Sequence, residues 1–245
     1  MKKIIFPFAF LCFSFSLFAQ KESPDKLGGL FKKANSILSK NSSSTNLSTN
    51  EIVSGLKEAL SLGAEKSGSK LSVADGFFKD AAVKILLPEE VREVEKKMRM
   101  LGMGKMVDKA VLSMNRAAED ASKSAAPIFI AAIKKMTVTD ALNILRGNDT
   151  AATGYLRKST SPELISAFMP VVEESLKKVD ATKYWEDVFT TYNRFSSKPV
   201  DTDINSYVTA KALDGIFYYV AQEEINIREN PAGRVTDMLK KVFGN

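Results

Sequence analysis

The stretch that most constrains the fold of this chain runs from Lys105 to Thr160. Small and apolar residues recur there at the spacing of one face of an α-helix. These residues are Val107, Ala110, Val111, Met114, Ala117, Ala118, Ala121, Ile128, Ala132 and Met136. Pro127 interrupts the pattern, and a proline inside a helix removes one backbone hydrogen bond. We therefore predict a long central helix, kinked or broken at Pro127, in a hairpin against which the other helices pack.

Signals for helix starts precede two further apolar patterns. Ser48 is followed three residues later by Glu51, and Thr137 is followed in the same way by Asp140. This spacing is typical of a capping box, in which each side chain bonds the backbone N–H of the other residue. The sequence therefore predicts that one helix begins after Ser48 and another after Thr137.

Glycine and proline suggest further boundaries. We expect Gly68 and Gly147 to end helices, Ser161-Pro162 to begin one, and Pro170 to bend it. No stretch of useful length alternates apolar and polar residues as a strand would. The predicted fold class is all-α: a multi-helix single globular domain packed around the long, Pro-kinked central helix.

The N-terminus has the layout of a cleaved secretory signal. Lys2 and Lys3 precede a Phe-rich apolar run from Ile4 to Phe18, and polar residues follow Ala19 and Gln20. We predict a signal peptide over residues 1–20, a short helix and polar linker over 21–50, and the helical domain over 51–245. The mature protein is then expected to be periplasmic or secreted, without a transmembrane span.

Composition excludes several chemistries. The chain has no His, and its single Cys lies in the predicted signal, so the mature chain offers no disulfide, thiol nucleophile, Ser-His-Asp triad or Cys/His metal site. We predict no cofactor and no metal. Removing Lys2 and Lys3 from the 35 basic residues leaves 33 against 29 acidic ones, a net charge of +4 that is too small to indicate nucleic acid.

Seven polar residues form the candidate site cluster. They are Asn115, Arg116, Glu119, Glu223, Glu224, Arg228 and Arg234. Two interpretations remain open: structural pairs that tie helices together, or a polar cluster in a cavity lined by the alanines. The two C-terminal arginines flank a predicted helix start, where they would hold an anion or pair with carboxylates across the core.

Several phrases resemble one known family. They are Asp75–Phe78, Met114–Glu119, Ala125–Phe129, Asp140-Ala141, Ile144–Gly147, Ala151–Leu156, Tyr207–Thr209, Asp214–Phe217, Glu223-Glu224 and Ile227–Pro231. In this order they are similar to the exported bacterial domain-of-unknown-function family numbered 4197, from about Glu51 to Asn245. The resemblance implies a helical, secreted protein. It carries over no catalytic residue, because the family has no assigned activity.

Three functions stay open. The first is a binding or interaction protein of the bacterial cell envelope, whose partner is another envelope protein or a small apolar ligand. The second is an enzyme with carboxylate and arginine chemistry around Glu119 and Arg228. The third is a peripheral membrane-surface protein that attaches through Lys21–Lys40. An aromatic stripe is interpreted as core or, if exposed, as a partner or lipid contact; it comprises Tyr184, Trp185, Phe189, Tyr192 and Phe195.

Overall fold

A computed structural model describes residues 48–178 and 203–229, together with residues 185, 189, 193 and 199. All of them fall within one unit, residues 46–245. The predicted signal, the helix of residues 21–40, Arg234 and three residues of the aromatic stripe lie outside the described residues. The described residues form helices and no strand, so the all-α prediction is confirmed.

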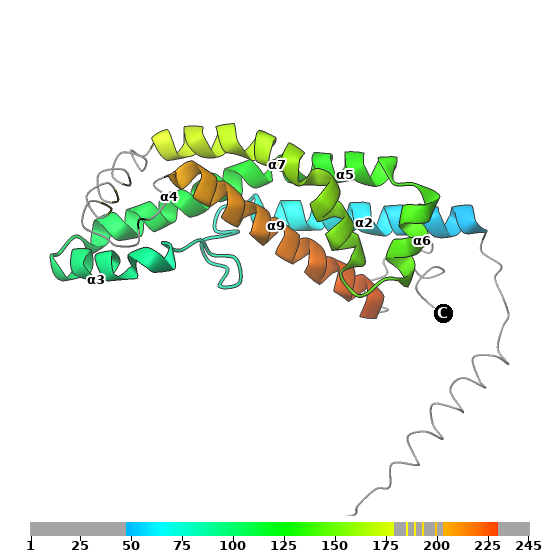
Figure 1. Ribbon diagram of the computed structural model, residues 1–245, viewed down its shortest axis with the longest axis horizontal. Coiled ribbons are helices and arrows are strands. Elements are labelled where there is room, and N and C mark those ends of the chain that lie inside the picture. The colour runs from blue at the N-terminus through cyan, green and yellow to red at the C-terminus, as the bar shows by residue number, and fades with distance from the viewer. Residues whose placement is uncertain are drawn as a thin grey trace, which may run out of the picture. The chain divides into compact units, whose positions relative to one another are not determined.

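The helices that the structure describes are labelled in chain order in Figure 1. They are α2 (Thr49–Leu71), η1 (Glu89–Val91), α3 (Arg92–Met100), α4 (Gly104–Ser122), α5 (Ala125–Lys135), α6 (Val138–Arg146), α7 (Ala151–Lys177) and α9 (Ile204–Glu229). Helix α9 packs on α2, α4 and α7, and α7 packs in turn on α4 and α5. The centre of the fold is therefore shared between α4, α7 and α9. By contrast, α3 packs mainly on α4.

The predicted central helix is divided into two helices. Helix α4 ends at Ser122 and α5 begins at Ala125, which places Pro127 in the first turn of α5. The first N–H groups of a helix have no partner within it, so the missing N–H of a proline costs little there. The structure thus has a break before Pro127 and no kinked continuous helix. Alanines on both sides of the break are fully buried: Ala117, Ala118, Ala121 and Ala125.

Gly68 does not end a helix, because α2 continues to Leu71. A Cβ added at Gly68 would lie 3.3 Å from the Cβ of Ala126. The absence of a side chain therefore lets α2 and α5 approach closely. The predicted stop was wrong because the glycine serves packing between two helices.

Pro162 does not begin a helix either, since α7 runs through Pro162 and Pro170 without interruption. Three hydroxyl side chains just before Pro162 donate to carbonyls one turn back. The pairs are Ser159 with Tyr155 at 2.9 Å, Thr160 with Leu156 at 2.6 Å, and Ser161 with Arg157 at 2.6 Å. These bonds go to the carbonyls of residues 155–157, whereas the carbonyl that loses its N–H partner to Pro162 is that of Lys158. The bend near Pro170 stays a prediction.

The local helix signals were otherwise correct. Both capping boxes form, at Ser48 with Glu51 and at Thr137 with Asp140. Gly147 is the C-cap of α6.

Candidate functional site

Asn115 fastens an extended segment to α4. Its Oδ1 accepts a hydrogen bond from the Ile85 N–H at 2.9 Å, and its Nδ2 donates to the Ile85 carbonyl at 2.8 Å. Nδ2 also donates to the Val111 carbonyl at 2.7 Å. Asn115 is fully buried, so these bonds satisfy polar groups that water cannot reach.

Glu119 and Arg116 bind the turn that contains Asp75. The Glu119 Oε1 accepts from the N–H groups of Phe77 and Phe78 at 3.1 and 3.2 Å. Its Oε2 accepts from Arg116 Nη1 at 2.6 Å, and Arg116 Nη2 donates to Asp75 Oδ1 at 2.7 Å. Asp75 itself has a positive φ of 69°, a conformation that aspartate tolerates better than most residues. The charged chain therefore clamps this turn onto α4.

Charges in this clamp stabilise one another. Hydrogen bonds from Lys79 and then Arg116 lower the pKa of the Asp75 carboxyl below its usual value. The bonds to Glu119 and Asp75 raise the pKa of the Arg116 guanidinium. Both groups stay ionised at neutral pH, as a structural ion pair requires.

The Phe77 side chain connects the clamped turn to the hydrophobic core. Its ring is fully buried, and a Cβ added at Gly215 would lie only 2.5 Å from its Cε1 atom. Gly215 belongs to α9. The turn that contains Phe77 is therefore in direct contact with the Asp214-Gly215 segment of α9. The glycine is required by the close approach of the aromatic ring.

Glu224 and Arg228 form a second, separate cluster. The Glu224 carboxylate accepts from the N–H groups of Ala152 and Thr153 at 2.9 and 2.8 Å, and from the Thr153 hydroxyl at 2.9 Å. Arg228 donates to Glu224 Oε1 at 2.9 Å and to the Ile144 carbonyl at 2.8 Å. The N-cap residue of α7 makes no side-chain cap bond. Glu224 therefore caps α7 from another helix, where the helix dipole also favours a negative charge.

The remaining predicted residues join neither cluster. Glu223 pairs at the surface with Lys66 at 2.7 Å, and Arg234 lies outside the described residues. Glu119 and Glu224 come from different helices but do not converge, because each is bonded to its own backbone N–H groups and its own arginine. Their lone pairs are engaged in structural bonds, which does not favour a role as general base.

The sequence did not predict a third polar cluster. Tyr219 donates its hydroxyl to Asp80 Oδ2, and Lys70 Nζ lies 3.6 Å from the same oxygen. The bond from Tyr219 lowers the pKa of Asp80, while burial raises the pKa of Tyr219. The three residues come from α2, the following turn and α9, so no local pattern could have joined them. Lys70 and Asp80 border a shallow open hollow of about 360 Å³.

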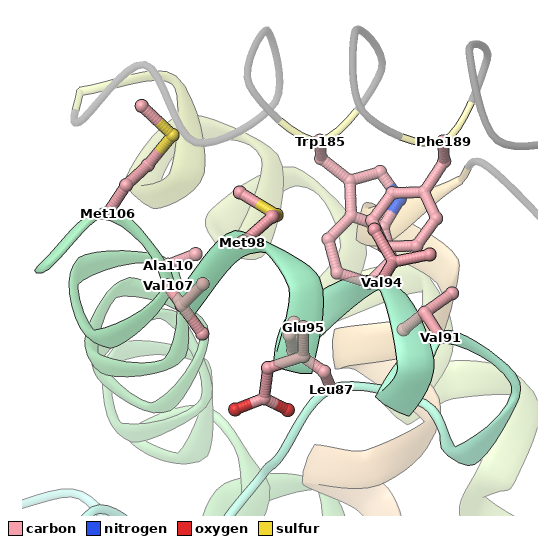
Figure 2. Close-up of a pocket in the computed structure, with 10 residues that line it drawn as sticks. All are labelled: Leu87, Val91, Val94, Glu95, Met98, Met106, Val107, Ala110, Trp185 and Phe189. Atoms are coloured by element: carbon pink, nitrogen blue, oxygen red, sulfur yellow. The ribbon is translucent and has the colours of Figure 1, made fainter. Parts of the chain in front are cut away.

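An apolar pocket lies between α3 and α4 and was also missed (Figure 2). It encloses about 40 Å³ and is lined by Leu87, Val91, Val94, Glu95, Met98, Met106, Val107, Ala110, Trp185 and Phe189. Glu95 is its one charged lining residue, and its carboxylate pairs with Arg99 at 2.8 Å. Figure 2 shows that carboxylate pointing away from the two aromatic rings. The pocket therefore presents an almost wholly apolar interior.

Trp185 is the most informative lining residue. It is 4% exposed. Its ring centroid lies 4.2 Å from the ring centroid of Phe189 and 6.1 Å from that of Tyr207. The indole N–H has no hydrogen-bond partner in the part of the chain that the structure describes. A buried donor without a protein partner is uncommon, and water or a ligand group can serve as the acceptor of such a donor.

Residues 48–178 and 203–229 and the four single residues between contain no group of three or more potential metal ligands of the His, Cys, Asp or Glu type. None of their helices combines the length and the apolar character needed to cross a membrane.

Comparison with known proteins places the chain in a family without assigning an activity. No curated protein and no solved structure matches it. The family described as protein of unknown function (DUF4197) matches residues 46–244, which is most of the chain. This chain is therefore a member of the DUF4197 family, as its motifs predicted.

Proposed function

We propose that this protein is a non-enzymatic binding protein whose pocket between α3 and α4 holds an apolar group of its ligand. The observation that carries the proposal is the apolar pocket beside a buried indole N–H that lacks a partner. Ligand pockets are typically apolar and contain a few polar groups that fix orientation. The engagement of Glu119 and Glu224 in structural bonds supports binding over acid–base catalysis.

The volume of the pocket limits which ligand groups can enter it. At about 40 Å³ it is much smaller than a cavity of roughly 150 Å³ that admits benzene. It has room for the end of an unbranched chain, and Met98 and Met106 on its rim are half-buried. Methionine is flexible and adapts to different occupants. The ligand class that fits is the apolar end of an alkyl or acyl chain.

Trp185 makes the proposal testable, because it is the only tryptophan of the chain. Bromine quenches indole fluorescence on close contact, so bromoundecanoic acid is titrated against undecanoic acid. We expect saturable quenching by the brominated acid alone, with the unbrominated acid competing. Quenching that rises linearly without saturation would contradict a binding pocket.

A matched pair of variants locates the binding. Ala110→Leu adds side-chain volume to the pocket, whereas Ala131→Leu makes the same change at a half-buried alanine of α5 away from it. Saturable quenching should be lost in the first variant and kept in the second. Thermal unfolding of both variants checks that they fold, since overpacking costs about 1–3 kcal/mol. Equal quenching in both variants would place the ligand elsewhere.

The cellular place of the protein is part of the proposal. The basic and apolar layout of residues 1–20 supports export to the periplasm or the exterior of a bacterial cell. Cell fractionation followed by N-terminal sequencing tests it, with a mature N-terminus near Lys21 expected. Full-length protein in the cytoplasm would refute it.

A further inference from the structure

We propose that the turn between α3 and α4 inserts into the surface of an anionic phospholipid membrane. This turn, called here the tip, comprises Met100, Leu101, Gly102 and Met103. The inference goes beyond the ligand pocket and does not depend on it.

The tip exposes large apolar side chains to solvent. Met100 and Leu101 are each 78% exposed, and Met103 is 37% exposed. Met100 and Leu101 are the most exposed large apolar residues among those that the structure describes. Two adjacent side chains exposed to this extent, at the end of a helix, mark a contact site rather than part of the core.

The backbone of the tip is prepared for an apolar environment. The Met103 N–H donates to the Met98 carbonyl at 2.9 Å, and the Gly102 N–H donates to the Arg99 carbonyl at 3.1 Å. Gly102 has a φ of 81°. These bonds and the left-handed glycine form a Schellman motif, which satisfies the N–H groups of Gly102 and Met103 and the carbonyls of Met98 and Arg99. The tip can thus leave water without stranding these N–H groups, whose loss of hydrogen bonds would oppose insertion.

Positive charge surrounds the tip. Residues 92–109 hold six basic and three acidic residues, a net charge of +3. Each acidic residue pairs with a basic neighbour within this hairpin: Glu93 with Lys96, and Glu95 and Asp108 with Arg99. Lys97, Lys105 and Lys109 are exposed and make no ion pair with any residue that the structure describes. These three lysines match the negative charge of phospholipid headgroups.

The small extent of the apolar patch favours a membrane over a protein partner. A stable protein interface takes roughly 20–30 residues on each side, whereas the tip offers only three large apolar side chains. A few apolar residues with flanking lysines suffice at a membrane, where insertion and charge attraction add together. We therefore commit to the anionic bilayer, and a second copy of the chain becomes an outcome of the test.

Sedimentation with lipid vesicles tests the proposal. The mature chain is mixed with vesicles of phosphatidylcholine alone, or of phosphatidylcholine with phosphatidylglycerol, and the bound fraction is measured. We expect sedimentation with the second kind only, and weaker binding as salt rises. Binding to neither kind, or equal binding to both, overturns the proposal.

Two variants separate the apolar and charged parts. Met100→Ser with Leu101→Ser should lower partitioning at least tenfold. Replacing Lys97, Lys105 and Lys109 with Gln should lower it about fivefold per charge, on the order of a hundredfold in total. If the double serine variant binds like the wild type, attraction is purely electrostatic and insertion is refuted.

Control variants make the same kinds of change at exposed residues elsewhere. Val138→Ser with Ile165→Ser removes two apolar side chains that are 45% and 44% exposed. Lys134, Lys135 and Lys158 changed to Gln remove three exposed lysines outside the hairpin. Both controls should bind like the wild type. Sedimentation without vesicles completes the set: a dimer that the double serine variant abolishes would assign the tip to a second copy and overturn the membrane proposal.

Discussion

Gly215→Ala is the sharpest test of how the clamp turn is held against α9. The new Cβ would lie 2.5 Å from Phe77 Cε1, 3.0 Å from Phe77 Cζ and 3.4 Å from the Val83 Cβ. Because the Phe77 ring is fully buried, it cannot swing into solvent to make room. The substitution must therefore shift either the ring or the helix.

The expected magnitude is a balance of two effects. Alanine in place of glycine inside a helix gains about 1 kcal/mol. Overpacking of a dense core costs about 1–3 kcal/mol, and a contact of 2.5 Å against a ring without space to move belongs near the upper end of that range. We expect a net loss of about 1–2 kcal/mol, seen as a urea midpoint lower by about 0.5–1 M if the slope is near 2 kcal/mol/M.

Gly154→Ala supplies the control with the opposite sign. Gly154 is the exposed fourth residue of α7, and a Cβ added there would meet nothing within 4 Å. The same chemical change should stabilise the protein by about 0.5–1 kcal/mol. If Gly215→Ala also stabilises the protein, the argument from close approach is wrong.

A double-mutant cycle with Phe77→Leu tests the identity of the contact. Leucine lacks the ring atoms nearest to Gly215, so Gly215→Ala should cost less in that background. An unchanged cost would assign the strain to another neighbour.

Two further predictions concern the buried polar groups. Glu224→Ala should lower the free energy of unfolding in urea by about 3–5 kcal/mol, because it leaves the Arg228 guanidinium, with 13% of its side chain exposed, without its carboxylate. The double variant Glu224→Ala with Arg228→Met should lose less stability. An equal or larger loss would contradict this explanation. Asp80 has a pKa below its usual value of 3.8, chiefly through the Tyr219 hydroxyl, so its ionised form contributes stability that is present above about pH 4 and lost as pH falls through the lower, folded-state pKa. Asp80→Asn should therefore lower stability at neutral pH and flatten the acid limb of a pH–Tm curve, and a parallel shift at every pH would exclude the linkage.

Three of the predicted site residues, Asn115, Glu119 and Glu224, are buried, but their partners could not be predicted. Asn115 and Glu119 were predicted only as polar residues of the central helix. Their bonds go to Ile85 and Phe77, 30 and 42 residues away in sequence. Glu224 binds Ala152 and Thr153 across 72 and 71 residues. Periodicity identifies a buried polar position, but nothing local indicates which backbone N–H groups it will meet.

Local signals failed where packing outweighed backbone preference. Gly68 and Pro162 both read as helix boundaries, and both lie inside helices. A glycine inside a helix costs only about 1 kcal/mol, which close contact between α2 and α5 offsets. Helix α7 likewise continues through Pro162, although the proline removes the N–H partner of the Lys158 carbonyl.

The sequence by itself determined the helical class, both capping boxes and the exclusion of His chemistry, because each depends on composition or on bonds within one turn. Only the tertiary structure decided that Glu119 holds the turn at Phe77, that Glu224 caps α7, that Phe77 contacts Gly215, and that Trp185 lines a pocket. The physical reason is the separation in sequence between the residues that interact. Helix signals act over three or four residues, whereas these contacts join segments dozens of residues apart that only the packed core brings together.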